Sequence, residues 1–285
     1  MENLKECSYY SKVEDNKVQC LLCPHNCKIG NNNIGLCKAR KNIEGILYSL
    51  NYGIISSYGM DPIEKKPLNN FYPQHRILSI GSFGCNLKCS FCQNYRISQV
   101  KGDGVATTPK NIVDIALREA KNLGIAFTYN EPLIGYEFVK DTAILNKEND
   151  KKNVLVTNGY INREPMEELL PYIDAMNIDL KFSNEEDYKK VAGGSLKPVL
   201  DTIELCNKKC HVEVTTLIVS GYNDNEKAIE KIAEMLSEID PKIPLHLSRY
   251  FPNYKYEEKA TSIEFMYEAL DIALKYLDTV YLGNI

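Results

Sequence analysis

Three cysteines in the run GSFGCNLKCSFCQN have a spacing suited to redox chemistry. Cys85, Cys89 and Cys92 follow one another as CxxxCxxC. Iron–sulfur clusters are ligated by cysteine thiolates, so this short stretch can hold three irons of a [4Fe–4S] cluster. No further cysteine follows before Cys206, which leaves one iron open for a small molecule. The spacing therefore indicates a catalytic cluster; the alternatives are a structural zinc site and unpaired buried thiols.

A second group of four cysteines lies near the start of the chain. Cys20, Cys23, Cys27 and Cys37 are separated by two, three and nine residues. Four thiolates can hold structural zinc in closed tetrahedral geometry, or a further iron–sulfur cluster. We favour zinc or another structural role, with folding or electron relay as the task, and His25 as an alternative ligand.

Short apolar runs alternate with longer amphipathic segments from residue 76 onward, a pattern typical of βα units and a parallel sheet. The expected strands are Ile77–Ile80, Ile125–Thr128, Val154–Thr157, Ala175–Asp179, His211–Val219, Leu245–Leu247 and Val280–Leu282. The expected helices are Asn111–Asn122, Leu133–Asn146, Asn225–Ile239 and Ser262–Tyr276. Six or so units predict an α/β fold with an open or partial barrel over residues 76–285. Residues 1–75 are expected to form a cysteine-rich, metal-stapled segment and cap.

Polar side chains gather where the expected strands end. Parallel α/β folds place their sites at the carboxyl ends of the strands, so these side chains should meet at one rim. In chain order they are Cys85, Thr128, Asn130, Glu131, Asn158, Asp179, Lys181, Glu213, Thr215, Thr216 and His246.

The cysteine loop resembles the cluster loop of radical S-adenosylmethionine (SAM) enzymes, including an aromatic residue, Phe91, before the third cysteine. Further motifs occur in the order seen in the radical SAM protein of the AmmeMemoRadiSam system, a group similar to pyruvate formate-lyase activating enzymes. They are CLLCPHNCKIG, GLCKAR, DPIEKKPL, SIGSFGCNLKCSFCQN, FTYNEP, VTNGY, NIDLK and EVTTLIVSGYND. The resemblance covers about residues 18–284.

This resemblance implies a partial (β/α)6 TIM-like barrel of the radical SAM type. It implies that the open iron binds SAM, and that reduction cleaves SAM to a 5′-deoxyadenosyl radical. The radical would remove a hydrogen atom from a protein, peptide or small-molecule substrate, as glycyl-radical enzyme activases do. An electron donor such as flavodoxin or ferredoxin is also implied.

The resemblance also assigns roles to individual residues. Glu131 would accept from the methionine ammonium of SAM, a charge-assisted contact supported by Thr128 and Asn130. Asn158 would bond the ribose hydroxyls, and Phe91 would contact the adenine.

Asp179, Lys181 and His246 are expected to touch the methionine carboxylate or the substrate. Simpler interpretations remain open beside these roles. Asn158 begins an Asn-Gly turn, and Glu131 could merely start a helix. Asp179 and Lys181 share a strand face and could form a plain ion pair, and His246 could be a core histidine.

DPIEKKPLNN reads either as a solvated loop or as a cap over the barrel mouth, where Lys65 or Lys66 would meet a substrate carboxylate or a partner. Relatives commonly carry a histidine in the stretch occupied here by residues 69–71, and another in the stretch 249–252. This chain has neither, so no role for those histidines is carried over.

Composition excludes several classes of protein. The chain has 285 residues, 44% hydrophobic and 25% charged, and a formal net charge of −4. This balance gives no excess of basic residues that would favour binding to nucleic acid. No apolar run is long enough to span a membrane. The start of the chain lacks the apolar core of a signal peptide, so a cytoplasmic enzyme is expected. The alternatives are an iron–sulfur electron carrier without SAM chemistry and a zinc-dependent interaction or RNA-binding module.

Overall fold

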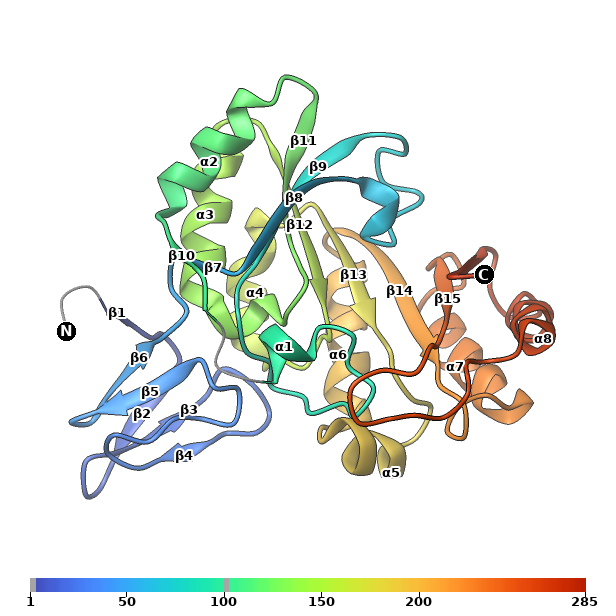
Figure 1. Ribbon diagram of the computed structural model, residues 1–285, viewed down its shortest axis with the longest axis horizontal. Coiled ribbons are helices and arrows are strands. Elements are labelled where there is room, and N and C mark those ends of the chain that lie inside the picture. Colours follow the sequence, from blue (N-terminus) through green and yellow to red (C-terminus); the bar gives the residue numbers. More distant parts are fainter. Residues whose placement is uncertain (1–3, 100–102) are drawn as a thin grey trace.

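An eight-stranded sheet forms the centre of the fold (Figure 1). The computed structural model describes residues 4–99 and 103–285. The strand order is β16-β15-β14-β13-β12-β11-β9-β8, and every neighbouring pair is parallel except β8 and β9. Because β16 and β8 do not pair with each other, the sheet is open and does not close into a full barrel. The expected α/β class with a parallel sheet is confirmed.

All seven expected strands are present. They are β9 (Arg76–Gly81), β11 (Asn122–Phe127), β12 (Lys152–Thr157), β13 (Ala175–Asp179), β14 (His211–Ile218), β15 (Leu245–Arg249) and β16 (Val280–Gly283). Their apolar runs suit strands covered on both faces. The eighth strand, β8 (Ser57–Pro62), was not expected, so the sheet begins before residue 76.

Helices follow the parallel strands and pack on the outside of the sheet (Figure 1). The principal ones are α2 (Pro109–Arg118), α3 (Tyr136–Glu148), α4 (Arg163–Leu169), α6 (Leu196–Asn207), α7 (Glu226–Ile239) and α8 (Ile263–Ala273). Thr108, Asn225 and Ser262 cap α2, α7 and α8 by accepting a backbone N–H with their side chains. Shorter pieces are η1 (Ile63–Lys65), α1 (Tyr95–Ser98), η2 (Pro132–Gly135), η3 (Leu170–Tyr172), α5 (Glu185–Asp187) and η4 (Tyr188–Ala192). No helix of the described residues has the length and apolarity to cross a membrane.

Short antiparallel strands make up the N-terminal region. One three-stranded sheet has the order β1-β6-β5 and another has the order β2-β3-β4, while β7 pairs with β10. Their bounds are β1 (Lys5–Glu6), β2 (Tyr10–Val13), β3 (Lys17–Cys20), β4 (Lys28–Ile29), β5 (Arg40–Ile43), β6 (Ile46–Ser49), β7 (Ile54–Ile55) and β10 (Val105–Ala106).

The segment 63–75 closes the barrel at the amino ends of the strands. It joins Pro62 to Arg76, which are paired at the amino end of β9. Ile63 and Leu68 are fully buried there, in one apolar cluster with residues of β9, β11, β12 and β13. DPIEKKPLNN therefore forms a floor under the lumen, and the expected cap over the mouth is not what the structure has.

Candidate active site

A cavity of about 360 Å³ is lined by residues from several of the sequence motifs. Its lining includes the predicted site residues Cys85, Cys89, Phe91, Cys92, Thr128, Asn130, Glu131, Asn158, Asp179 and Lys181. Most of them follow the carboxyl ends of β9, β11, β12 and β13, as the rule for parallel sheets predicts. The sequence did not single out several other lining residues, among them Gln99, Leu217 and Ser248.

The three thiols of the cluster loop face this cavity. Cys89 is buried, and Cys85 and Cys92 are partly buried. Burial raises the pKa of Cys89 to about 11, and the nearby Lys181 acts in the opposite direction. Among the described residues, no three His, Cys, Asp or Glu side chains lie close enough together to hold one metal ion. The fit of the triad to an iron–sulfur cluster therefore rests on its soft sulfur donors and on the shared cavity.

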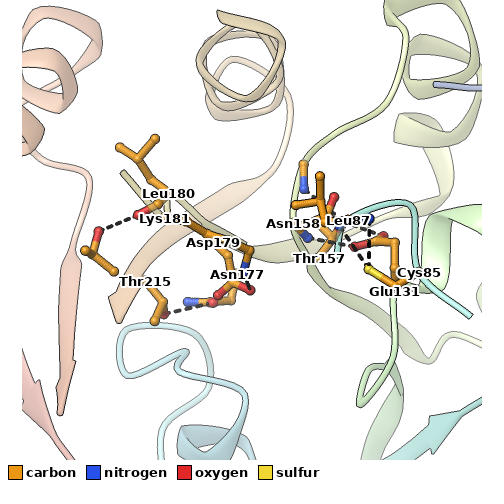
Figure 2. A network of polar contacts seen from close by, with 12 residues as sticks. Cys85, Leu87, Glu131, Thr157, Asn158, Asn177, Asp179, Leu180, Lys181 and Thr215 are labelled. Carbon is orange, nitrogen blue, oxygen red and sulfur yellow. Dashed lines mark hydrogen bonds and ion pairs between the residues drawn. The ribbon is translucent and has the colours of Figure 1, made fainter. Parts of the chain in front are cut away.

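Glu131 lies at the start of η2 and is almost fully buried. Its Oε1 accepts from the backbone of Leu133 at 2.9 Å and from Thr157 Oγ1 at 2.7 Å. Its Oε2 accepts from the backbone of Asn158 at 2.8 Å (Figure 2). Burial raises the pKa of Glu131 to about 7, against the effect of these donors. The helix-capping alternative is thus correct, and the same carboxylate also lines the cavity.

Asn158 links the end of β12 to the cluster loop. Its Nδ2 donates to Asn86 Oδ1 at 2.9 Å and lies 3.6 Å from Cys85 Sγ (Figure 2). Its Oδ1 accepts from the backbone of Tyr160 at 2.9 Å, and Gly159 has φ +66°. The Asn-Gly turn is therefore present, and the side chain of Asn158 is hydrogen-bonded to the cluster loop. Sequence reasoning missed Asn86, which no spacing pattern marks.

Asn130 and Phe91 complete this end of the cavity. Asn130 accepts from the backbone of Ser82 at 2.9 Å and donates to the carbonyl of Gly84 at 3.1 Å, so it supports the approach to Cys85. Phe91 is buried and packs edge-on against Phe182.

Asp179 and Lys181 form an ion pair of 2.9 Å at the end of β13 (Figure 2). Although burial works against its charge, Asp179 holds the pKa of Lys181 above the usual range. The ion-pair alternative is thus correct, and both side chains also line the cavity.

Lys66 and Lys65 line the cavity from the floor. Lys66 is only 3% exposed; its Nζ lies 2.8 Å from Asp61 Oδ2 and 4.7 Å from the centre of the Tyr129 ring. Burial lowers the pKa of Lys66, while Asp61 acts in the opposite direction. Lys65 is largely exposed.

His246 does not reach the cavity, which corrects its expected role. It is the second residue of β15 and therefore lies near the amino end of the strand. Its Nε2 bonds Glu213 Oε2 at 2.6 Å, and its ring stacks on Tyr281. Glu213 is fully buried and also accepts from the backbones of Asn69 and Asn70, so this group anchors the floor.

The second cysteine group lines a separate, smaller cavity in the N-terminal region. Cys20, Cys23, Cys27 and Cys37 share it with His25, Arg40, Asn86 and Ile134. The His25 ring is bonded to the carbonyl of Asn86 at 2.7 Å. All four cysteines that the sequence grouped as metal ligands therefore line one cavity, although no three of them lie close enough together in the described residues to hold one metal ion.

The sequence profile of the Radical SAM superfamily matches residues 79–236, more than half of the chain. An uncharacterized protein of Methanocaldococcus jannaschii is 44% identical over 99% of this chain and 86% of its own. Pyruvate formate-lyase 1-activating enzyme of Escherichia coli is 26% identical over 53% of this chain. That match covers 64% of the activating enzyme, less than two thirds of its length.

A solved structure shows the same fold. Streptococcus suis SuiB, in its crystal structure bound to the precursor peptide SuiA, superimposes with a TM-score of 0.56 at 17% identity. The match covers 70% of this chain and 46% of SuiB. At this identity the likeness concerns the fold alone.

Proposed function

This chain belongs to the radical SAM superfamily, and is therefore an enzyme with a [4Fe–4S] cluster and SAM as cofactors; we propose that Cys85, Cys89 and Cys92 hold that cluster. The observation that carries the proposal is that the three thiols share one cavity with Glu131 and Asn158. When bound, the two cofactors supply radical chemistry that removes a hydrogen atom from a substrate. The protein's part is to bind, orient and shield.

Glu131 is the proposed acceptor for the methionine ammonium of SAM. Leu133, Thr157 and Asn158 fix its carboxylate at the cavity wall, and a carboxylate has further acceptor capacity beyond those three bonds. A charge-assisted bond to an ammonium is among the stronger ones, particularly at a buried position. Thr128 supports this wall.

Asn158 has a positioning role in this proposal. Its amide restrains Cys85, so a ribose contact would exchange one of its present bonds for a bond to the sugar. Phe91 supplies the apolar surface for adenine, and together with Leu87 and Leu217 it keeps water from that part of the cavity. Lys181, charged beside Asp179, is the proposed partner of the methionine carboxylate.

The substrate proposed for the floor side is one that carries an acidic group. Lys66 and Lys65 bring two amines to the cavity wall, and Lys66 is buried against a single carboxylate, that of Asp61. An anionic substrate would find partly desolvated cations there, where charge pairs are least screened. We propose a protein, peptide or small-molecule acid; the activating enzymes among its relatives favour a protein or peptide.

We also propose that the chain is the radical SAM member of an AmmeMemoRadiSam system, on the order of its motifs, and that a flavodoxin or ferredoxin supplies the electron. The test of the cluster proposal is electron paramagnetic resonance of the anaerobically reconstituted, reduced protein. Added SAM should change the cluster signal, and Cys89→Ala should remove that SAM-sensitive signal. A cluster signal that SAM leaves unchanged would favour the electron-carrier alternative.

A further inference from the structure

The four-cysteine cavity has no part in the mechanism above, yet it lies against the cluster loop. Cys20 ends β3, Cys27 precedes β4, and their backbones are joined by a bond of 2.9 Å from Cys20 N to Cys27 O. Cys20 and Cys37 are buried, and Cys23 and Cys27 are partly buried. These four thiols come from an 18-residue stretch and line one cavity, so they can supply the donors of one metal centre once the segment draws them together around the metal.

One contact between the two cysteine sites runs through the residue after Cys85. Asn86 lines the four-cysteine cavity, and its carbonyl is bonded to the His25 ring at 2.7 Å. Its side chain donates to the carbonyl of Tyr160 at 2.7 Å and accepts from Asn158, which also reaches Cys85. Asn86 is therefore fixed from the N-terminal region on one side and from β12 on the other.

A second contact involves the residue before Cys85. Gly84 has φ +90°, and a Cβ built on it would lie 2.5 Å from the carbonyl oxygen of Cys37 and 2.8 Å from the side chain of Ile134. The cluster loop thus packs directly on the backbone of one of the four cysteines. Only glycine allows this approach, because any side chain would collide with backbone. Both chain neighbours of Cys85 therefore touch the four-cysteine segment.

Arg40 anchors that segment to the wall of the active site. It is almost fully buried and bonds both oxygens of Glu137 on α3, at 2.8 and 2.9 Å. It also donates to the carbonyls of Ile134 at 3.3 Å and Ser8 at 3.1 Å. Since Ile134 belongs to η2, which begins after Glu131, the N-terminal segment is tied to the same element that Glu131 caps.

We propose that Cys20, Cys23, Cys27 and Cys37 bind a metal centre through four thiolates, and that this centre holds the loop Gly84–Asn86 so that Cys85 is placed for its cluster. The second part rests on the proposed function of Cys85. Metal binding by thiolates fixes chain segments that have little structure of their own, because the free energy of metal binding offsets the entropy lost when they become ordered. His25, Asn86 and Gly84 are positioning residues, because they transmit this order and touch no reacting atom.

The test uses the full chain with Cys23→Ser and Cys27→Ser combined, since these two cysteines are the less buried ones. Iron, zinc and sulfide are measured per protein, together with amide hydrogen exchange of residues 84–92. The double variant should lose the N-terminal metal, exchange about tenfold faster over residues 84–92, and hold clearly less of the SAM-sensitive cluster. Cys210→Ser, which removes a partly buried thiol elsewhere, is the matched control and should match the wild type.

His25→Ala keeps all four cysteines and removes one link. It should retain the N-terminal metal and still loosen residues 84–92, so the proposal remains testable if the double variant does not fold. Cys89→Ala empties the other site. Zinc in this variant would identify a zinc centre, and iron with sulfide would identify a cluster.

Two results would overturn the proposal. One is an N-terminal site that binds neither zinc nor iron in Cys89→Ala. The other is unchanged amide exchange over residues 84–92, together with an unchanged SAM-sensitive cluster, either in the double variant without its N-terminal metal or in His25→Ala. The function proposed for the triad fails separately, when Cys89→Ala keeps the SAM-sensitive signal.

Discussion

The side-chain amide of Asn158 lies 3.6 Å from the sulfur of Cys85, although 73 positions separate the two residues in the chain. The same amide bonds Asn86, and the backbone of Asn158 donates to Glu131. One residue at the end of β12 therefore contacts a proposed cluster ligand and the proposed SAM acceptor. Interactions of this kind orient ligands and tune metal centres without touching the metal.

Replacing Asn158 with Ala should weaken both sites that it contacts. Loss of its bonds to Cys85, Asn86 and Tyr160 should reduce SAM affinity or cluster retention by about 10–100-fold. SAM binding by equilibrium dialysis and iron content per protein are the measurements. Asn149→Ala, at the exposed end of α3, is the control. Wild-type values for Asn158→Ala in both measurements would remove its positioning role.

Glu131→Gln should separate charge from structure. Glutamine keeps one acceptor oxygen, for Leu133 and Thr157, so η2 should still be capped, but the negative charge and the acceptor for the Asn158 N–H are lost. Hydrogen bonds to charged groups contribute about 1.5–3 kcal/mol, so SAM should bind about 10–100-fold more weakly while cluster content stays unchanged. Glu164→Gln, an exposed change on α4, is the comparison. Equal SAM affinity in all three proteins would exclude Glu131 from the SAM site.

Lys66 and Lys65 give a matched pair for the proposed anion-binding floor. Succinate serves as a simple acidic probe, titrated against the reconstituted protein with SAM present. Lys66→Gln should weaken its binding about tenfold, because Lys66 is buried and its charge is poorly screened. Lys65→Gln should have a much smaller effect, since an exposed charge contributes little. Identical succinate binding by the two variants would argue against an acidic substrate.

Glu213 should make the floor sensitive to acid. Although burial raises the pKa of Glu213, its bonds from His211, His246 and Asn70 outweigh burial and lower that pKa from 4.5 to about 2. A carboxyl group whose pKa is lower in the folded than in the unfolded protein stabilises the fold at pH values above its unfolded pKa. The free energy of unfolding should therefore fall by up to about 3 kcal/mol as the pH drops from 4.5 to 2.

Glu213→Gln cannot titrate, so it should lose this part of the pH dependence. It should also be less stable than the wild type at pH 7, where two backbone N–H groups and two imidazoles lose their ionised partner. Denaturant unfolding of the metal-free proteins between pH 7 and pH 2 compares the two. If the free energy of unfolding fell equally with pH in both proteins, the Glu213 cluster would contribute no acid sensitivity.

The parallel strands were predictable because strands buried on both faces are short apolar runs. Ala175–Asp179 was located to the residue. β8 was missed, since SYGMDP contains glycine and proline and has no apolar run. Without that antiparallel strand, the direction of the chain after Pro62 could not be inferred, so the floor was placed at the mouth.

Whether a predicted residue reaches the site depends on how near it lies to the carboxyl end of its strand. His246 was expected at the rim because it lies on a predicted strand, but membership of a strand does not say how far along the barrel a residue lies. β15 continues to Arg249, so Ser248 lines the cavity instead, two positions further on the same face. Asn86 and Arg40 were missed for another reason: their importance comes from partners distant in the chain, and no local pattern marks them.

The most direct measurement is formation of 5′-deoxyadenosine from SAM by the anaerobically reconstituted, chemically reduced protein, with and without an acidic peptide. The account predicts that the wild type forms it and that Cys85→Ala, Cys89→Ala and Cys92→Ala each do not, while Cys210→Ser matches the wild type. Formation by the triad variants at the wild-type rate would contradict the assignment of the cluster to these three cysteines. No formation by a wild type whose cluster is intact, under either condition, would contradict radical SAM chemistry at this site.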